Sequence, residues 1–448
     1  MSRGGMRPSG RALSESDSEV RACAPCYPEA IRMSLLPYSS AFSRVTALAA
    51  LRTVHSAFAW LHGNSGKIMD WQARLVAIPA PPFGEAARSE WLAARFSEAG
   101  LSQVQTDAVG NVFGFLPAAK LPPESTGPVV VLSAHLDTVF PAETPLKPVV
   151  EGDRLQAPGA SDNGAGVVGM LAVAHALIEA GAELAAPLVF LGNVGEEGEG
   201  DLRGMRHFYS QEALAGRIAA HIVLDGPGAD SAVTQALGSR RFRVTITGPG
   251  GHSFTDAGTP NPIAALASAL AVLATTSLPV EPRTTLNLGT IHGGTSVNSI
   301  PESAAASIDF RSTGSDELLR LEVALHRAVE DSVEHWNASA SNRNRGVLSF
   351  TIKKIGDRPA ACLASDSPLL ETLCAVDRHL GLKADLRLGS TDANIPLSLG
   401  IPALSMGAGG EGGGAHTLAE WYSARGREAG LRRVVLLALA MLEWAAEQ

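Results

Sequence analysis

Short runs of apolar residues, rich in valine, leucine and isoleucine, alternate with longer helical patterns over most of the chain. Strands are predicted at Val129–Ser133, Leu188–Gly192, Ile222–Leu224 and Pro402–Met406, and a helix is predicted at Gly166–Ala180. Continuous apolar runs of this length are typical of parallel strands that are buried on both faces. Because helices alternate with them, the pattern predicts an α/β fold, a three-layer domain with a mostly parallel mixed sheet.

A different order of elements follows between residues 238 and 356. The apolar periodicity there predicts strand, helix, strand, strand, helix and strand, at Arg241–Thr247, Pro262–Thr276, Thr284–Ile291, Ala304–Ser312, Ser315–Trp336 and Val347–Lys354. This βαββαβ order is the ferredoxin-like pattern, a two-layer unit with its own sheet. The α/β pattern resumes at residue 357, so we expect a unit inserted into a larger domain that comprises residues 45–237 and 357–448.

The first part of the chain differs from the rest. Residues 1–40 carry no sustained periodicity, which predicts a disordered or misassigned leader. The next stretch, Ala41–Leu61, is moderately apolar but is interrupted by Arg44 and Arg52, so we interpret it as an amphipathic helix and not as a secretion signal. No run of eighteen apolar residues occurs, which argues against a membrane-spanning segment, and the sequence favours a cytoplasmic location.

The composition is that of a globular protein. The chain has 448 residues, enough for two or three domains, of which 45% are hydrophobic and 18% charged. The formal net charge of −9 gives no support to a nucleic-acid partner, which would require a basic face. The four cysteines do not form a disulfide framework in a chain of this size.

Two adjacent glutamates, Glu196 and Glu197, follow the predicted strand at Leu188–Gly192. Carboxylates this close repel each other, and placing them near an apolar interior costs free energy unless protons or cations compensate their charge. The pair therefore predicts a bound cation or a shifted protonation state where this strand ends.

Further imidazole and carboxylate side chains follow the other predicted strands or the loops beyond them. They are His135 and Asp137 in HLD, Asp162 in SDNG, Asp225 in LDG and His416 in AHT. Singly, Asp162 could be a helix N-cap, Asp225 a turn residue and His416 a loop residue. Together they lie near the carboxyl ends of strands, the edge where open α/β sheets bind ligands. Nitrogen and carboxylate ligands without thiolates suit zinc, or less specifically cobalt or manganese.

The order HLD, SDNG, GEEG, LDG and AHT resembles the M20 family of dinuclear zinc metallopeptidases and amidohydrolases, from about residue 50 to the C-terminus. The resemblance implies a zinc-dependent hydrolase that cleaves amide bonds of small peptides, with two Zn²⁺ per chain and Co²⁺ or Mn²⁺ as possible substitutes. Deacylation of an N-acyl amino acid would use the same residues and is the alternative. A non-catalytic binding protein is disfavoured because the set of acids and imidazoles is complete.

The resemblance also implies a role for each residue of this set. The metal ligands would be His135 and Asp225 for one zinc, Glu197 and His416 for the other, and Asp162 as the bridge between the two. Asp137 would support His135. Glu196 would be the general base and acid: it would take a proton from the metal-bridged water, whose hydroxide attacks the amide, and return the proton to the leaving amine.

The inserted unit resembles the family's lid or dimerisation domain. Its GGHS loop implies that His252 donates a hydrogen bond to the developing oxyanion in the active site of the other subunit of a homodimer. His252 could instead cap a turn of the lid. Asn298, Arg311 and Ser390 match substrate-binding positions, although Arg311 could be a surface charge. Such a site has to close, so we expect a hinge near Ala236–Gly238 and residues 357–358.

Overall fold

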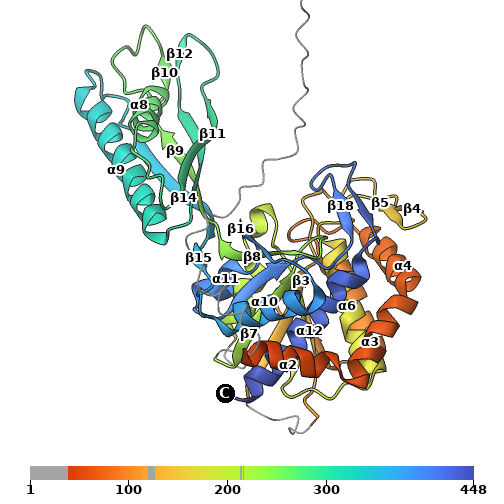
Figure 1. Cartoon of the computed structure of the whole chain (residues 1–448). Helices are drawn as coiled ribbons and strands as arrows, with labels where there is room; N and C mark the ends of the chain where they lie inside the picture. The colour runs from red at the N-terminus through yellow and green to blue at the C-terminus, as the bar shows by residue number, and fades with distance from the viewer. Residues whose placement is uncertain (1–38, 120–126, 212–213, 215) are drawn as a thin grey trace, which may run out of the picture.

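The computed structural model describes residues 39–119, 127–211, 214 and 216–448 (Figure 1). The predicted leader, residues 1–40, lies almost entirely outside these described residues. The described chain forms two units, each built around its own sheet. We call residues 238–358 the inserted unit and the remainder the base unit.

The base unit is built on a nine-stranded mixed sheet, in the order β1-β2-β6-β3-β7-β17-β8-β15 with β16 paired to β8. Its strands are β1 (Ser102–Thr106), β2 (Val112–Leu116), β3 (Val129–His135), β6 (Leu188–Asn193), β7 (Ile218–Leu224), β8 (Ser231–Ala236), β15 (Ala361–Cys362), β16 (Asp385–Gly389) and β17 (Ala403–Met406). The four central strands β6, β3, β7 and β17 are parallel. This sheet confirms the α/β class and the four strands that the apolar runs predict.

Helices cover both faces of the base sheet. They are α2 (Ser40–Ala49), α3 (Arg52–Gly63), α4 (Ser65–Val76), α5 (Ala86–Ala99), α6 (Gly164–Glu179), α7 (Arg203–Ser210), α10 (Pro368–Leu380), α11 (Asn394–Ser398) and α12 (Arg427–Ala446). Along β3, Val130 and Leu132 pack in one core with α6 and α12, whereas Val129 and Val131 pack in another with α7. Every residue of β3 is buried, as expected for the middle layer of three.

The stretch predicted as one amphipathic helix, Ala41–Leu61, is instead two helices. The helix α2 ends at Ala49 and α3 begins at Arg52, because Leu51 between them has an extended backbone. Each helix turns its own short apolar stripe toward the core, which one straight helix would not achieve with the same residues. No helix among the described residues is long and apolar enough to cross a membrane.

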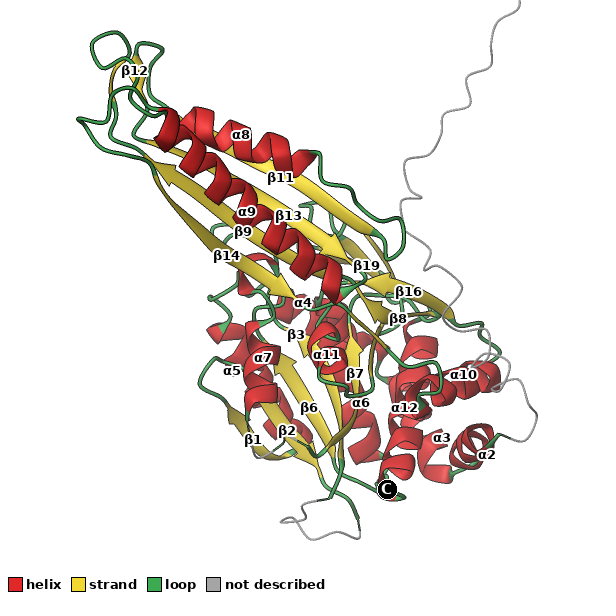
Figure 2. Cartoon of the chain, turned by 90° about the vertical axis from the view of Figure 1, so that its left-hand side faces the viewer, coloured by secondary structure: helices red, strands yellow, loops and turns green. Residues whose placement is uncertain are grey.

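The inserted unit is a four-stranded antiparallel sheet with two helices on one face (Figure 2). Its elements are β9 (Gly238–Thr247), β10 (Gly251–His252), α8 (Pro262–Ala274), β11 (Thr284–Gly293), β12 (Ser299–Ile300), β13 (Ser303–Ser312), α9 (Ser315–Ser339) and β14 (Ser349–Arg358). The strand order β11-β13-β9-β14 is ferredoxin-like, with the small pair β10–β12 added at the far end. Phe242, Val244 and Ile246 alternate along β9 and form the core beneath the helices.

Two crossovers join the units. The chain enters the inserted unit at Leu237, between β8 and β9, and leaves it between β14 and β15. The side-chain amide of buried Asn394 donates to the carbonyl oxygens of Leu237 and Pro359, both at 2.9 Å. One side chain of the base unit therefore fastens both crossovers, at the places where the sequence predicts a hinge.

Candidate metal centre

The candidate ligands converge at the carboxyl ends of the central strands. His135 is the last residue of β3, Asp225 follows β7, and Glu197 lies four residues beyond β6. Asp162 precedes α6, and His416 lies in the turn between β18 (Glu411–Gly413) and β19 (Trp421–Ser423). These two strands form a small antiparallel sheet with β5 (Arg154–Gln156) and β4 (Val149–Glu151).

The five side chains form two groups of three, one of His135, Asp162 and Asp225 and the other of Asp162, Glu197 and His416. Within the first, His135 Nε2 lies 3.2 Å from Asp162 Oδ1 and 3.8 Å from Asp225 Oδ1. Within the second, His416 Nε2 lies 3.0 Å from Asp162 Oδ2 and 3.0 Å from Glu197 Oε1. Asp162 thus offers a different oxygen to each group.

This arrangement fits divalent metal ions. Oxygen Oδ1 of Asp162 is buried and has no hydrogen-bond partner among the described residues, although an imidazole nitrogen lies nearby. Such an oxygen is costly to bury unless a cation compensates it. The donor set of imidazole nitrogens and carboxylate oxygens is that of zinc sites without thiolates. The two groups could each hold one ion, with Asp162 shared between them.

The protonation of the imidazoles also reflects these carboxylates. The hydrogen bond to Asp162 is the main cause that raises the pKa of His416 to about 9. Burial acts to lower the pKa of His135, but its contacts with Asp137, Asp162 and Asp225 raise that pKa well above the usual value. In the metal-free protein, protons on these rings therefore occupy positions that a metal ion would take, so binding would release protons.

Asp137 connects His135 to the two glutamates. His135 Nδ1 lies 3.1 Å from the backbone oxygen of Asp137 and 3.7 Å from its Oδ1. The same carboxylate accepts the backbone N–H groups of Glu196 at 2.9 Å and Glu197 at 2.7 Å. Asp137 therefore fixes the backbone that carries both glutamates and also lies beside the imidazole that it was predicted to support.

The loop that carries Asp162 is held by a residue that the sequence reasoning missed. The Glu420 carboxylate is fully buried and accepts the backbone N–H groups of Gly159, Ser161 and Asp162 and the hydroxyl of Ser161, at 2.7–2.8 Å. The only feature of the sequence that could have indicated a role for Glu420 near the candidate ligands is its position four residues after His416. Asn163, and not Asp162, caps α6: Asn163 Oδ1 accepts the backbone N–H of Gly166.

A second missed residue, Arg358, binds the predicted general base. Arg358 Nη1 donates to Glu196 Oε1 at 2.8 Å, and Nη2 donates to the backbone oxygen of Glu196. Burial raises the pKa of Glu196 well above its usual range, while the charge of Arg358 lowers it. Arg358 is the last residue of β14, and nothing in the sequence around it predicts a contact with Glu196.

Ser390 lies at the same place, since Arg358 Nη1 also donates to Ser390 Oγ at 3.3 Å. Two residues further, Asp392 is fully buried and accepts a hydrogen bond from Asn193 Nδ2 at 2.7 Å. Burial raises the pKa of Asp392 to about 7. The loop between β16 and α11 therefore contacts the arginine that binds Glu196, and the substrate-binding role of Ser390 stays a prediction.

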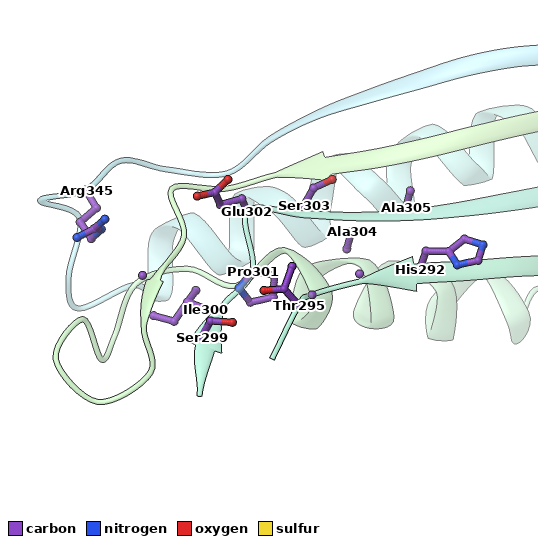
Figure 3. A pocket seen from close by; sticks show the side chains of 13 residues that line it. His292, Thr295, Ser299, Ile300, Pro301, Glu302, Ser303, Ala304, Ala305 and Arg345 are labelled. Carbon is purple, nitrogen blue, oxygen red and sulfur yellow. The ribbon is translucent and has the colours of Figure 1, made fainter. Parts of the chain in front are cut away.

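The other predicted residues, His252, Asn298 and Arg311, lie on the inserted unit. No hydrogen bond or ion pair among the described residues joins them to the candidate ligands. A pocket of about 700 Å³ lies at the far end of this unit, beside β10 and β12, and is lined by Gly251 and Ser299, the neighbours of two of these residues (Figure 3). Within one chain, the structure brings together the candidate metal ligands, Asp137, Glu196 and Ser390, but not these three.

His252 does cap a turn of its own unit. Its Nδ1 accepts the backbone N–H groups of Phe254 at 3.2 Å and Thr255 at 3.3 Å. Because Nδ1 accepts, the neutral ring carries its proton on Nε2. The side chain is exposed, so this second nitrogen is a donor available to a ligand or to another chain.

Comparison with known proteins places the chain in a family. The model of peptidase family M20/M25/M40 matches residues 131–443. The chain is 31% identical over 275 residues to a probable carboxypeptidase of Ajellomyces dermatitidis, an alignment that covers 56% of this chain and 57% of that protein. The chain therefore spans little more than half the length of the curated relatives it matches.

Solved structures show the same fold. Aminopeptidase PepT from Bacillus cereus superposes with a TM-score of 0.67 at 20% identity, over 85% of this chain and 99% of that one. The YXEP protein of Bacillus subtilis, a dinuclear metal-binding peptidase of the M20 family, gives 0.60 at 16% identity over 85% and 99%. The family model covers well over half of the chain, and on that ground the chain belongs to peptidase family M20/M25/M40.

Proposed function

We propose that this chain is a metal-dependent hydrolase that cleaves amide bonds of small peptides. The observation that carries the proposal is the pair of three-residue groups that share Asp162 through its two separate oxygens. The carboxypeptidase relatives and the peptidase structures of the same fold support a peptide as the substrate. We propose zinc as the metal, two ions per chain, because the ligands are nitrogen and oxygen atoms.

When bound at these ligands, such ions supply Lewis-acid polarisation of the amide carbonyl and a water of lowered pKa. Glu196 takes the proton of the attacking water and later delivers it to the leaving amine. Arg358 donates to Glu196 Oε1, which leaves Oε2 as the proton-accepting atom. Burial raises the pKa of Glu196, which makes its carboxylate a stronger base for the first of these transfers.

Asp137 keeps Glu196 and Glu197 in their different orientations by accepting both of their backbone N–H groups. Ser390 stands beside Arg358, at the position proposed for substrate contact. His252 and Asn298 would reach the substrate by movement of the inserted unit or from the second subunit of a homodimer. In either case, His252 Nε2 donates to the oxyanion that forms on the attacked carbonyl. Arg311 lies closer to the candidate metal centre, because it is opposite Ser239 on β9 and Ser239 is opposite Arg358.

A substrate panel tests the proposal. Protein purified without chelator is supplied with Zn²⁺, Co²⁺ or Mn²⁺ and incubated with dipeptides, tripeptides, N-acetylated tripeptides, tripeptide amides and N-acyl amino acids, and products are identified by mass spectrometry. We expect cleavage of the free peptides that is lost with a chelator and in the Glu196→Gln variant. Cleavage of N-acyl amino acids alone would replace the peptidase proposal with the deacylase alternative, and no cleavage with any metal would reject both.

A further inference from the structure

Among the residues that the structure describes, the helices of the inserted unit cover one face of its sheet and no helix covers the other (Figure 1). Side chains alternate between the two faces, so the neighbours of the core residues Phe242 and Val244 point to this open face. Besides Arg358, the open face carries four cationic residues, Arg241 and Arg243 on β9, Arg311 on β13 and Lys353 on β14. The strands place one carboxylate, Asp309, among them. A chain with a net charge of −9 thus has a locally basic surface here.

The cationic side chains on the two faces of these strands differ in how many carboxylate partners they have. On the helix side, Arg240 and Lys354 each pair with both Glu322 and Asp357, at 2.7–3.2 Å. On the open face, Arg241 and Arg311 share Asp309 through their Nε atoms, at 3.1 and 2.8 Å. Arg243 and Lys353 are exposed and form no side-chain hydrogen bond or ion pair within the described chain. The open-face cations therefore exceed what the fold itself needs.

The row of cations begins at the candidate active site. Arg358, which binds Glu196, lies opposite Ser239, and Ser239 lies opposite Arg311 on its other side. Residues directly opposite each other in a sheet point to the same face. Arg243, opposite Lys353, is four residues further along β9, about 13 Å away at roughly 3.3 Å per residue. The open face therefore leads outward from Glu196 with cations along its length.

We propose that this row binds acidic side chains of the peptide substrate, so that the enzyme prefers acidic peptides. An extended peptide presents side chains on one face every second residue, about 6.6 Å apart, which is also the spacing between Arg241 and Arg243. Guanidinium groups bind carboxylates in a directional, two-pronged manner. The inference rests on the proposed function for the reaction, but the binding itself can be measured without turnover.

The test uses a fluorescein-labelled pentamer of D-glutamate and a matched pentamer of D-glutamine, whose D configuration guards against cleavage. Binding to the purified protein is followed by fluorescence anisotropy at low ionic strength. We expect the glutamate pentamer to bind more tightly, and Arg243→Gln combined with Lys353→Gln to weaken that binding roughly two- to thirty-fold, without affecting the glutamine pentamer. The control removes two cations from the helix side of the same unit, Arg320→Gln with Arg327→Gln, and should change the affinity less than two-fold.

Equal binding of the two pentamers, or an equal loss in the control variant, would overturn the proposal. A labelled thymidine hexanucleotide provides a further arm: if it binds as tightly and loses affinity in the same double variant, the face binds polyanions in general and the acidic-peptide proposal is wrong. Failure of the substrate panel would reject hydrolysis but leave these affinities interpretable. If the enzyme cleaves peptides but binds the glutamate and glutamine pentamers equally, only the proposed preference for acidic peptides is rejected.

Discussion

Arg358 Nη1 lies 2.8 Å from Glu196 Oε1, so the last strand of the inserted unit holds the glutamate that follows β6 of the base unit. The same region is fastened at the backbone. Asp201 accepts the backbone N–H of Asp357 at 3.0 Å, and Arg206 Nη2 donates to the Asp357 oxygen. Movement of the inserted unit would therefore be transmitted to Glu196, the proposed general base, directly through its ion pair with Arg358. It would also be transmitted to the segment after Glu196 through the bonds of Asp357 to Asp201 and Arg206.

The Arg358–Glu196 pair should be energetically coupled in the metal-free protein. Both side chains are more than nine-tenths buried, so removing one partner leaves a buried group without its counter-charge. We expect Arg358→Gln and Glu196→Gln to be non-additive by about 0.5–3 kcal/mol in urea unfolding with a chelator present. The exposed pair Glu317–Arg320 serves as the control, with about 0.5 kcal/mol or less. Additivity of the buried pair would contradict its role.

The adjacent glutamates should respond differently to the same substitution. Glu196→Gln should lower turnover by about 10²–10⁴-fold with the metal content unchanged, because an amide cannot accept the proton of water. Glu197→Gln should instead lower the metal content, since Glu197 Oε1 faces His416 in the second group. Metal analysis beside kinetics on both variants checks this. The opposite pattern would show that the two roles are reversed.

Three of the candidate ligands, His135, Glu197 and Asp225, could be predicted from sequence because they lie at or just beyond the ends of strands with clear apolar runs. Once a buried parallel strand is recognised, the residues just beyond it are predicted to lie at the carboxyl edge of the sheet. Their side chains then indicate which ligand that edge could bind. His135 at the end of β3 and Asp225 directly after β7 are of this kind. The split of Ala41–Leu61 into two helices was missed because both halves have the same periodicity and Leu51 carries no turn signal.

Arg358 and Glu420 could not be predicted in this way. Each acts on a loop that is distant in the chain, 162 residues away for Arg358 and Glu196 and 259 for Glu420 and Ser161. Neither belongs to a short motif, and a charged residue at a strand end or in a loop is ordinarily solvent-exposed. Their partners become evident only when the two units and the small β18–β19 sheet are placed in space.

Glu420 should govern metal affinity without touching the metal. Glu420→Gln replaces an acceptor-only carboxylate by an amide, which cannot satisfy all four donors of the Gly159–Asp162 loop, so Asp162 would lose its fixed position. We expect roughly ten- to hundred-fold weaker zinc binding, as for other residues that orient ligands. Competition with a chromophoric chelator measures it. Glu411→Gln, on nearby β18, is the control and should bind zinc normally.

Stability in acid should depend on His221, which is buried in the base sheet. Its ring nitrogens lie 2.7 Å from the Tyr209 hydroxyl and 2.8 Å from the Ser133 hydroxyl. Burial lowers the pKa of His221 to about 3, whereas the unfolded chain takes up this proton near its usual pKa of 6.5. The folded state is thus disfavoured as the pH falls from 6.5 toward 3, by up to about 1.4 kcal/mol per pH unit.

The comparison with His221→Gln isolates this contribution. At pH 7 the variant should be less stable by about 1–3 kcal/mol, because Gln cannot satisfy both hydroxyl partners. Its disadvantage should shrink as the pH is lowered below 6.5, since Gln does not titrate. Urea unfolding of both proteins in chelator at several pH values gives the difference. A constant difference between pH 7 and pH 4.5 would show that His221 is not the titrating group.

We expect His252 to act on the candidate metal centre of another subunit. His252 lies at the far end of the inserted unit, its Nδ1 is already occupied by the backbone of its own turn, and its Nε2–H is exposed. An oxyanion donor is worth roughly 2.7–4 kcal/mol, or about 10²–10³ in turnover, so we expect His252→Ala to lose that factor.

Mixing this variant with Glu196→Gln under conditions that exchange subunits separates the two arrangements. If His252 acts across a two-fold dimer, both substitutions in a heterodimer affect the same active site and the other site is intact. About a quarter of the wild-type activity should therefore return at full random exchange. Verified exchange without recovery would mean that His252 acts within its own chain or has only its turn-capping role. Analytical ultracentrifugation of the wild type establishes beforehand whether a dimer exists to be exchanged.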